Sequence, residues 1–205
     1  MDRFSFFFAF YGLLLGLAVA ELLGGFARMV RAKAVRKIEA QTALIALLTF
    51  LLICATWIDA FGQFTNVSLD FAGLWAPILT GTAYYLVATV IFPTDEREFD
   101  RLANYFADRK RFMIAMLLAA ETFVNVTSLQ FYTTAFNERP ASFWLVIVPF
   151  NLMINAIFVA LLLVRSRRLN IILLAAQIIL FVLVYWSRGA LVALAHENYG
   201  YLWTR

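Results

Sequence analysis

Residues 143–187 read FWLVIVPFNLMINAIFVALLLVRSRRLNIILLAAQIILFVLVYWS, and this stretch decides the fold. It holds two apolar runs, 143–164 and 169–187, separated by the four residues RSRR at 165–168. An α-helix needs about 20 apolar residues to cross about 30 Å of hydrocarbon, and each run has about that length. The stretch therefore predicts two transmembrane helices joined by a short basic turn.

The rest of the chain repeats this pattern. Of the 205 residues, 63% are hydrophobic and 15% are charged, whereas a soluble domain has roughly 45–50% apolar and about 25% charged residues. This composition excludes a soluble globular domain, a disordered chain and a disulfide-rich secreted module. We predict an all-α, polytopic membrane helical bundle that forms one integral membrane domain over residues 1–205, with six transmembrane helices at about 5–27, 41–62, 71–92, 112–134, 143–164 and 169–187.

The distribution of basic residues predicts the orientation. The connections 28–40, 93–111 and 165–168 hold 5, 5 and 3 basic residues, which is 13 of the 17 Lys and Arg. Cytoplasmic loops carry such an excess, so these connections are expected inside and both termini on the outer side. On this topology five tryptophans belong to the outer interface, as half of an aromatic belt would: Trp57, Trp75, Trp144, Trp186 and Trp203.

Two further segments bear on the topology. Residues 1–20 contain an A-x-A-like sequence, Ala18-Val19-Ala20, but cleavage there would place the basic 28–40 connection outside, and we expect span one to be retained. Phe99, Leu102 and Phe106 recur at helical spacing, which predicts a short amphipathic helix at about 95–110 on the cytoplasmic surface. We interpret it as a connector; the alternative is that the 28–40 and 93–111 loops bind a cytosolic partner.

Several kinds of site are excluded by residue counts. Cys54 is the one cysteine and His196 the one histidine, so we expect no internal disulfide, no metal cluster and no bis-histidine haem. The three lysines, Lys33, Lys37 and Lys110, lie in polar connections, which excludes a retinal Schiff base inside a span. No Walker A, GxSxG or HExxH pattern occurs. We therefore expect no cofactor, no metal, no catalytic constellation and no nucleic-acid partner.

Polar residues inside the spans are the candidate site. An ionisable side chain in hydrocarbon is costly, and Glu21 and Glu121 are the two carboxylates well inside the predicted spans. Asp59 and Asp70, at span ends, are weaker candidates. Glu121, Asn125, Ser128 and Tyr132 follow one another at helical spacing on span four, and Asn151 and Asn155 share a face of span five.

The hairpin of spans four and five predicts which of these residues meet. If it folds about residue 138, Asn125 lies level with Asn151, and Glu121 lies level with Asn155 at about 15 Å from the basic rim. We expect Glu121 to be protonated at neutral pH and hydrogen-bonded to Asn155, because the charged carboxylate loses most by leaving water. Three other polar residues are expected in the same layer: Glu21, Tyr84 (with Tyr85) and Gln177.

Small residues recur every four positions on span one. Gly12, Gly16, Ala20 and Gly24 form a small-xxx-small stripe, which lets helix backbones approach closely. We therefore expect Gly16 to face another helix at short range, within the subunit or between subunits.

The function that these features favour is a small bacterial inner-membrane channel or transporter for a small solute or ion. We expect it to lie in the lipid bilayer as a homo-oligomer, with Glu121 and Glu21 as proton-titrating or ligand-contacting groups. The alternative is a non-catalytic membrane anchor, sensor or assembly subunit of a larger complex. An intramembrane enzyme ranks third, because no nucleophile–base pair is visible.

Overall fold

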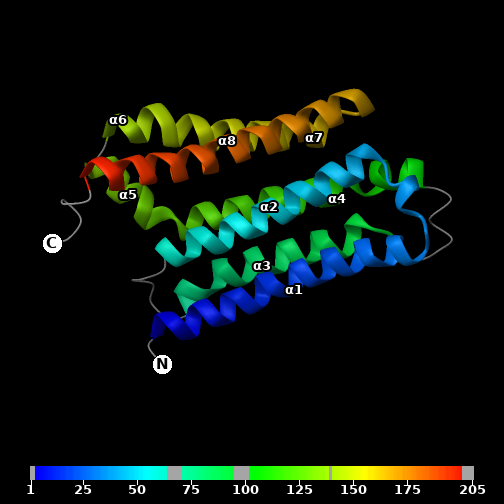
Figure 1. Ribbon diagram of the computed structural model, residues 1–205, viewed down its shortest axis with the longest axis horizontal. Coiled ribbons are helices and arrows are strands. Elements are labelled where there is room, and N and C mark those ends of the chain that lie inside the picture. The colour runs from blue at the N-terminus through cyan, green and yellow to red at the C-terminus, as the bar shows by residue number, and fades with distance from the viewer. Residues whose placement is uncertain (1–2, 64–70, 95–101, 139, 200–205) are drawn as a thin grey trace.

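The computed structural model describes residues 3–63, 71–94, 102–138 and 140–199, and within these ranges every regular element is a helix. Figure 1 shows the long helices running side by side along one direction. Their bounds are α1 (Arg3–Arg31), α2 (Ala40–Gln63), α3 (Phe71–Ile91), α4 (Leu102–Thr127), α7 (Val148–Leu163) and α8 (Arg167–Tyr199). Shorter elements connect them: η1 (Val35–Lys37), α5 (Leu129–Glu138), α6 (Pro140–Ser142) and the π-helical turn η4 (Phe143–Ile147).

The helices pack in three layers of two. α1 and α3 form one layer, α2 and α4 the middle layer, and α7 and α8 the third (Figure 1). The most extensive contacts join α3 to α4 and to α1, and α2–α8 and α4–α7 contacts attach the third layer to the middle one. The third layer touches the bundle on one side, so large apolar side chains of α7 such as Leu152 and Leu163 are exposed, as in a helix that faces lipid.

The structure shows a multi-pass membrane architecture. Five unbroken helices are long and apolar enough to cross a bilayer, and the segments Tyr105–Thr127 and Tyr132–Glu138 together make a sixth span if their 59° bend is counted within one crossing. The predicted span at 112–134 is thus a broken helix rather than a straight one. Thr122 and Thr127 each donate a side-chain hydrogen bond back into the preceding turn of α4, a contact that bends helices.

Basic residues gather at one end of the bundle. α1, α3 and α7 end there and α2, α4 and α8 begin there, so the described basic residues of the three connections share this side, which we name the basic end. α1 begins and α8 ends at the opposite end (Figure 1), near which Trp57, Trp75 and Trp144 also lie in α2, α3 and η4. Trp203 lies outside the described residues.

The prediction of a separate surface helix at 95–110 is wrong for the residues that the structure describes. Residues 102–110 are the first turns of α4, and residues 95–101, Phe99 among them, lie outside the described residues. Tyr105 and Phe106 are buried, and the Tyr105 hydroxyl donates to the Val90 carbonyl at 2.9 Å. The segment stays in the bundle because its aromatic side chains pack against α3 and Lys110 finds buried hydrogen-bond acceptors.

The expected packing of Gly16 is also wrong. A Cβ atom added to Gly16 would meet nothing within 4 Å, and one on Gly24 would meet only Arg28 of its own helix, at 3.9 Å. A Cβ atom added to Gly12 would lie 3.2 Å from Trp57 Nε1, and Ala20 is exposed. α1 instead buries the neighbouring face, whose residues are Tyr11, Leu15, Ala18, Leu22, Gly25 and Met29.

Two other glycines make the close approaches between α1 and α3. A Cβ atom on Gly25 would lie 2.9 Å from Phe92 Cδ2, and one on Gly81 would lie 3.0 Å from Leu14 Cβ. Large side chains fill the rest of this contact, so the rotation of α1 is set by where its bulky residues bury rather than by its small-residue stripe.

Candidate functional site

A cavity of about 480 Å³ lies in the half of the bundle away from the basic end. Its walls come from the second halves of α2 and α4, from α5, from the start of α7 and from the middle of α8. Most lining side chains are apolar, and the polar ones are Thr56, Asp59, Glu121, Asn125, Ser128, Tyr132, Asn151 and Tyr185. Two carboxylates, Asp59 and Glu121, therefore share one cavity. We name it the acidic cavity.

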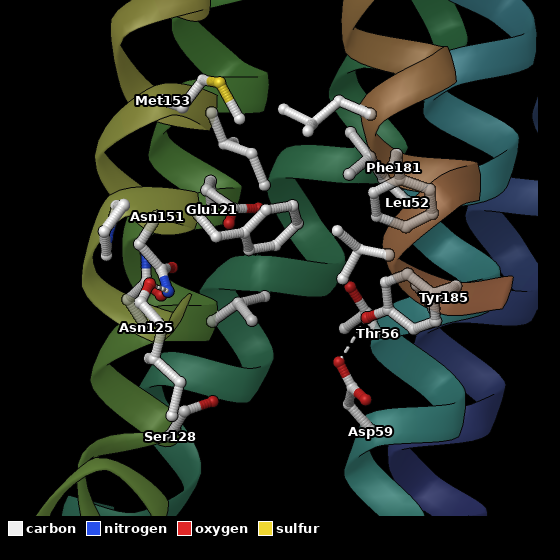
Figure 2. A pocket seen from close by; sticks show the side chains of 18 of the residues that line it. Leu52, Thr56, Asp59, Glu121, Asn125, Ser128, Asn151, Met153, Phe181 and Tyr185 are labelled. Atoms are coloured by element: carbon white, nitrogen blue, oxygen red, sulfur yellow. Dashed lines mark hydrogen bonds between the residues drawn. The ribbon is translucent and has the colours of Figure 1, made fainter. Parts of the chain in front are cut away.

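Figure 2 shows two rows of side chains that face each other across this space. Asp59, Thr56 and Tyr185 lie on one side, together with Leu52 and Phe181. The other side carries Glu121, Asn125, Ser128, Asn151 and Met153.

Hydrogen bonds hold the wall formed by α2 and α8. The Tyr185 hydroxyl donates to Asp59 Oδ2 at 2.5 Å. One turn earlier on α2, Thr56 Oγ1 and the Tyr84 hydroxyl lie 3.0 Å apart and share a hydrogen bond. Tyr84 is 1% exposed and stands behind this wall rather than in the cavity. Tyr84 therefore supports Thr56 from α3. It was expected in the polar layer, and it reaches that layer only through its hydrogen bond with Thr56.

The opposite wall is held by a second tyrosine. The Tyr132 hydroxyl donates to Asn125 Oδ1 at 2.6 Å and lies 3.3 Å from Asn151 Oδ1. The Asn151 amide nitrogen donates to the Ile147 carbonyl at 2.9 Å. The structure thus brings Asn125 and Asn151 together, as the hairpin register predicts.

The expected Glu121–Asn155 hydrogen bond is absent. Asn155 donates to the Asn151 carbonyl of its own helix at 2.8 Å and does not line the cavity. Within the described part of the chain, no hydrogen bond joins the Glu121 carboxyl to another residue. The bend before α5 and the wide turn η4 alter the rise per residue on both sides of the hairpin, so an ideal-helix count misplaces positions deeper in the spans.

Both helices of this wall depart from regular α-helix beside the cavity. α4 stops at Thr127, α5 starts at Leu129, and Ser128 between them lines the cavity. η4 precedes α7, and Pro149 at the second position of α7 lacks the amide hydrogen that would continue the regular pattern. Irregular backbone at membrane depth is tolerated where it lines a cavity, and such breaks are frequent at functional sites.

Glu21 lies elsewhere. Its carboxylate forms an ion pair with Arg28 of the same helix, with Nη2 and Oε1 3.1 Å apart, and α1 does not line the acidic cavity. Seven residues are about two turns, so the long arginine side chain can reach back along α1. The expectation that Glu21 joins the polar layer is wrong, because a cation near the end of its own helix compensates its charge.

Gln177 is fully buried on α8, one turn from Phe181 and two turns from Tyr185. Both of its amide atoms lack a hydrogen-bond partner among the described residues. An unsatisfied buried amide is uncommon and costs about 1–3 kcal/mol, so it needs a reason. It lies on the side of the acidic cavity toward the basic end and does not line that cavity.

Asp59 and Tyr185 are the site residues that sequence reasoning underrated. Asp59 follows Thr56 by three positions and so shares its helix face, and this spacing was the available signal. Tyr185 carries no such signal, because only the packing of α8 against α2 places it beside Asp59.

Comparison with protein-family models, with curated proteins and with solved structures finds no match for this chain. The class that the fold defines is therefore a helical, multi-pass membrane protein with a polar cavity between its helices.

Proposed function

We propose that this protein is a channel or transporter for a small solute or ion, and that the acidic cavity is its binding site. The observation that carries the proposal is the pair of carboxylates, Asp59 and Glu121, on opposite walls of one cavity whose lining, over the described residues, contains no Lys, Arg or His. Carboxylates at membrane depth without a protein cation mark ion pathways and proton relays. The favoured solute is therefore a proton, a metal cation or a small protonated amine.

Size and backbone geometry support the same function. A cavity of about 480 Å³ falls in the range of roughly 300–1,000 Å³ that is typical of small-molecule sites. The bend between α4 and α5 makes a discontinuous helix of the type that transporters use to build binding sites, and the π-helical turn η4 adds a local irregularity beside the cavity.

The cellular setting is part of the proposal. We place the protein in the bacterial inner membrane with the basic end in the cytoplasm, because basic residues favour that side. The exposed stripe of Gly16 and Ala20 on α1 is the proposed contact for a homo-oligomer. We propose no enzymatic activity.

Proteoliposomes test the transport proposal. The vesicles contain a pH-sensitive dye and are loaded with potassium, sodium or methylammonium, so that the cation concentration is higher inside than outside. The internal pH and the release of the cation are then measured over time. We expect the native protein to accelerate at least one flux over protein-free vesicles. Glu121→Gln and Asp59→Asn should each reduce that flux by about tenfold or more, which corresponds to about 1.4 kcal/mol.

Glu21→Gln is the matched control, because it removes a carboxylate of the same kind outside the cavity. Its flux should equal that of the native protein. The proposal fails if no probe crosses faster than in protein-free vesicles. That result favours the non-catalytic subunit. The proposal also fails if Glu121→Gln and Asp59→Asn both transport normally, because the acidic cavity would then not be the transport site.

A further inference from the structure

A second cavity, of about 430 Å³, opens at the basic end between the start of α4, the start of α2 and the turn that joins α7 to α8. Its polar residues form a floor and a rim. Gln41, Lys110 and Asn170 are buried, and the exposed arginines that line it are Arg111, Arg165 and Arg167.

Lys110 is the central group of this floor. It is 6% exposed, and its amine donates to the Val164 carbonyl and, at 3.1 Å, to Asn170 Oδ1. Both acceptors are neutral, and in the described part of the chain no carboxylate forms an ion pair with Lys110. The ammonium group is therefore fixed in place by two hydrogen bonds while its charge is left without a counter-charge.

The rim adds to this excess of positive charge. The lining contains four basic residues and one acidic residue, Asp108. Arg167 has a partner outside the lining, since its Nη2 lies 3.3 Å from Glu39 Oε1. Arg111 and Arg165 form no ion pair within the described ranges. Arg111, Arg165 and Lys110 thus bring three positive charges to the lining of one cavity, and none of the three forms an ion pair with a carboxylate in the described residues.

The backbone at the start of α8 also favours an anion. Asn170 donates its backbone N–H to the Ser166 carbonyl at 3.0 Å, which makes this the first hydrogen bond of α8. The amides before it have no helical partner, and the start of a helix carries partial positive charge. α8 has 33 residues, so this end is a full helix terminus.

We propose that this basic-end cavity binds a phosphate group. Guanidinium and ammonium donors match phosphate oxygens, and arginine binds them through two parallel hydrogen bonds. The cavity lies where transmembrane helices end, at the depth of lipid headgroups, and basic pockets between helices at that depth bind anionic headgroups. The phosphate can belong to an anionic phospholipid or to a phosphate-bearing solute. The proposal is independent of transport through the acidic cavity.

Binding to the full-length protein in neutral detergent tests the proposal. The probes are dioleoyl-phosphatidylglycerol, dioleoyl-phosphatidylcholine, and sodium phosphate against sodium chloride at equal ionic strength. Native mass spectrometry measures bound lipid, and thermal unfolding measures stabilisation by each probe. We expect the native protein to prefer phosphatidylglycerol over phosphatidylcholine, or phosphate over chloride. The first preference identifies a headgroup as the source and the second a solute.

Two double variants make the test specific. Arg111→Gln with Arg165→Gln removes two rim cations, and its affinity for the preferred probe should fall by about tenfold or more, because two charge-assisted hydrogen bonds are lost. Arg31→Gln with Arg168→Gln removes the same charge from the same end outside the cavity and should bind as the native protein does. All four side chains are exposed, so both variants should fold.

Replacing Arg111 and Arg165 by lysine keeps the charge and should restore part of the affinity. The proposal is overturned if the native protein shows neither preference, or if the two glutamine variants lose the same affinity. The second result would mean that diffuse surface charge, not this cavity, attracts the anion.

Discussion

The Tyr185 hydroxyl donates a 2.5 Å hydrogen bond to the carboxylate of Asp59, and this contact joins α8 to α2 across 126 residues of sequence. Across the cavity, Tyr132 makes the matching contact with Asn125. Each wall of the acidic cavity is thus held by one tyrosine hydroxyl, and the space between the walls contains the Glu121 carboxyl (Figure 2).

Tyr185→Phe should destabilise the protein. The substitution keeps the ring that packs on Phe181, with ring centroids 4.5 Å apart, and removes the hydroxyl that donates to Asp59. We expect a loss of about 1–3 kcal/mol, measured as unfolding in detergent. Tyr85→Phe, at an exposed position of α3, should leave stability unchanged. An equal loss in both variants would show that the Asp59 contact adds nothing.

Val124→Cys in a Cys54→Ala background should react with a water-soluble, membrane-impermeant maleimide. Val124 lines the acidic cavity, and a thiol reacts only where water allows it to ionise. Val182→Cys is the control, because Val182 is exposed on the outer face of α8 and does not line the cavity. We expect labelling at 124 and none at 182. Equal rates would contradict a hydrated cavity.

Gly25→Ala should lower stability and Gly16→Ala should not. The new methyl group at Gly25 would lie 2.9 Å from Phe92, and overpacking of this kind costs about 1–3 kcal/mol. At Gly16 it meets nothing within 4 Å, and alanine favours a helix by up to about 1 kcal/mol over glycine. Thermal unfolding in detergent measures both. A loss at Gly16 alone would place the α1 contact on the small-residue stripe after all.

Lys110→Met should destabilise the α7–α8 turn. It leaves the Val164 carbonyl and the Asn170 amide oxygen without their donor, at a cost of about 1–3 kcal/mol for each buried group. Lys33→Met, at an exposed position, is the control. Hydrogen exchange should quicken around residues 164–170 in the first variant only. Unchanged exchange there would mean that Lys110 does not hold the turn.

Reporter fusions test the orientation. A reporter after residue 35 should be cytosolic and one after residue 205 exported, because 13 of the 17 basic residues lie in the connections expected inside. An exported reporter at the first position, or a cytosolic one at the second, would reverse the orientation of the basic end.

Part of the candidate site could be predicted from the spacing of polar residues along the sequence. Asn125, Ser128 and Tyr132 share one stripe of the chain, and all three line the cavity, as does Asn151. The predicted pairing of Glu121 with Asn155 was wrong. The prediction assumed straight helices, whereas the hairpin is bent by 59° before α5. Lys110 was expected in a polar connection, yet it is buried near the start of α4, and its acceptors, Val164 and Asn170, lie 54 and 60 residues later in the chain.

The sequence by itself determined the membrane-length helices and the basic end, because the apolar content of each segment is a local property that decides its transfer into hydrocarbon. Tertiary structure alone decided which faces of the helices meet. Lipid is as apolar as leucine, so hydrophobicity does not select the buried face of a transmembrane helix, and interhelical packing and hydrogen bonding select it instead. That choice turned Gly25 rather than Gly16 toward α3, and placed Asp59 opposite Glu121.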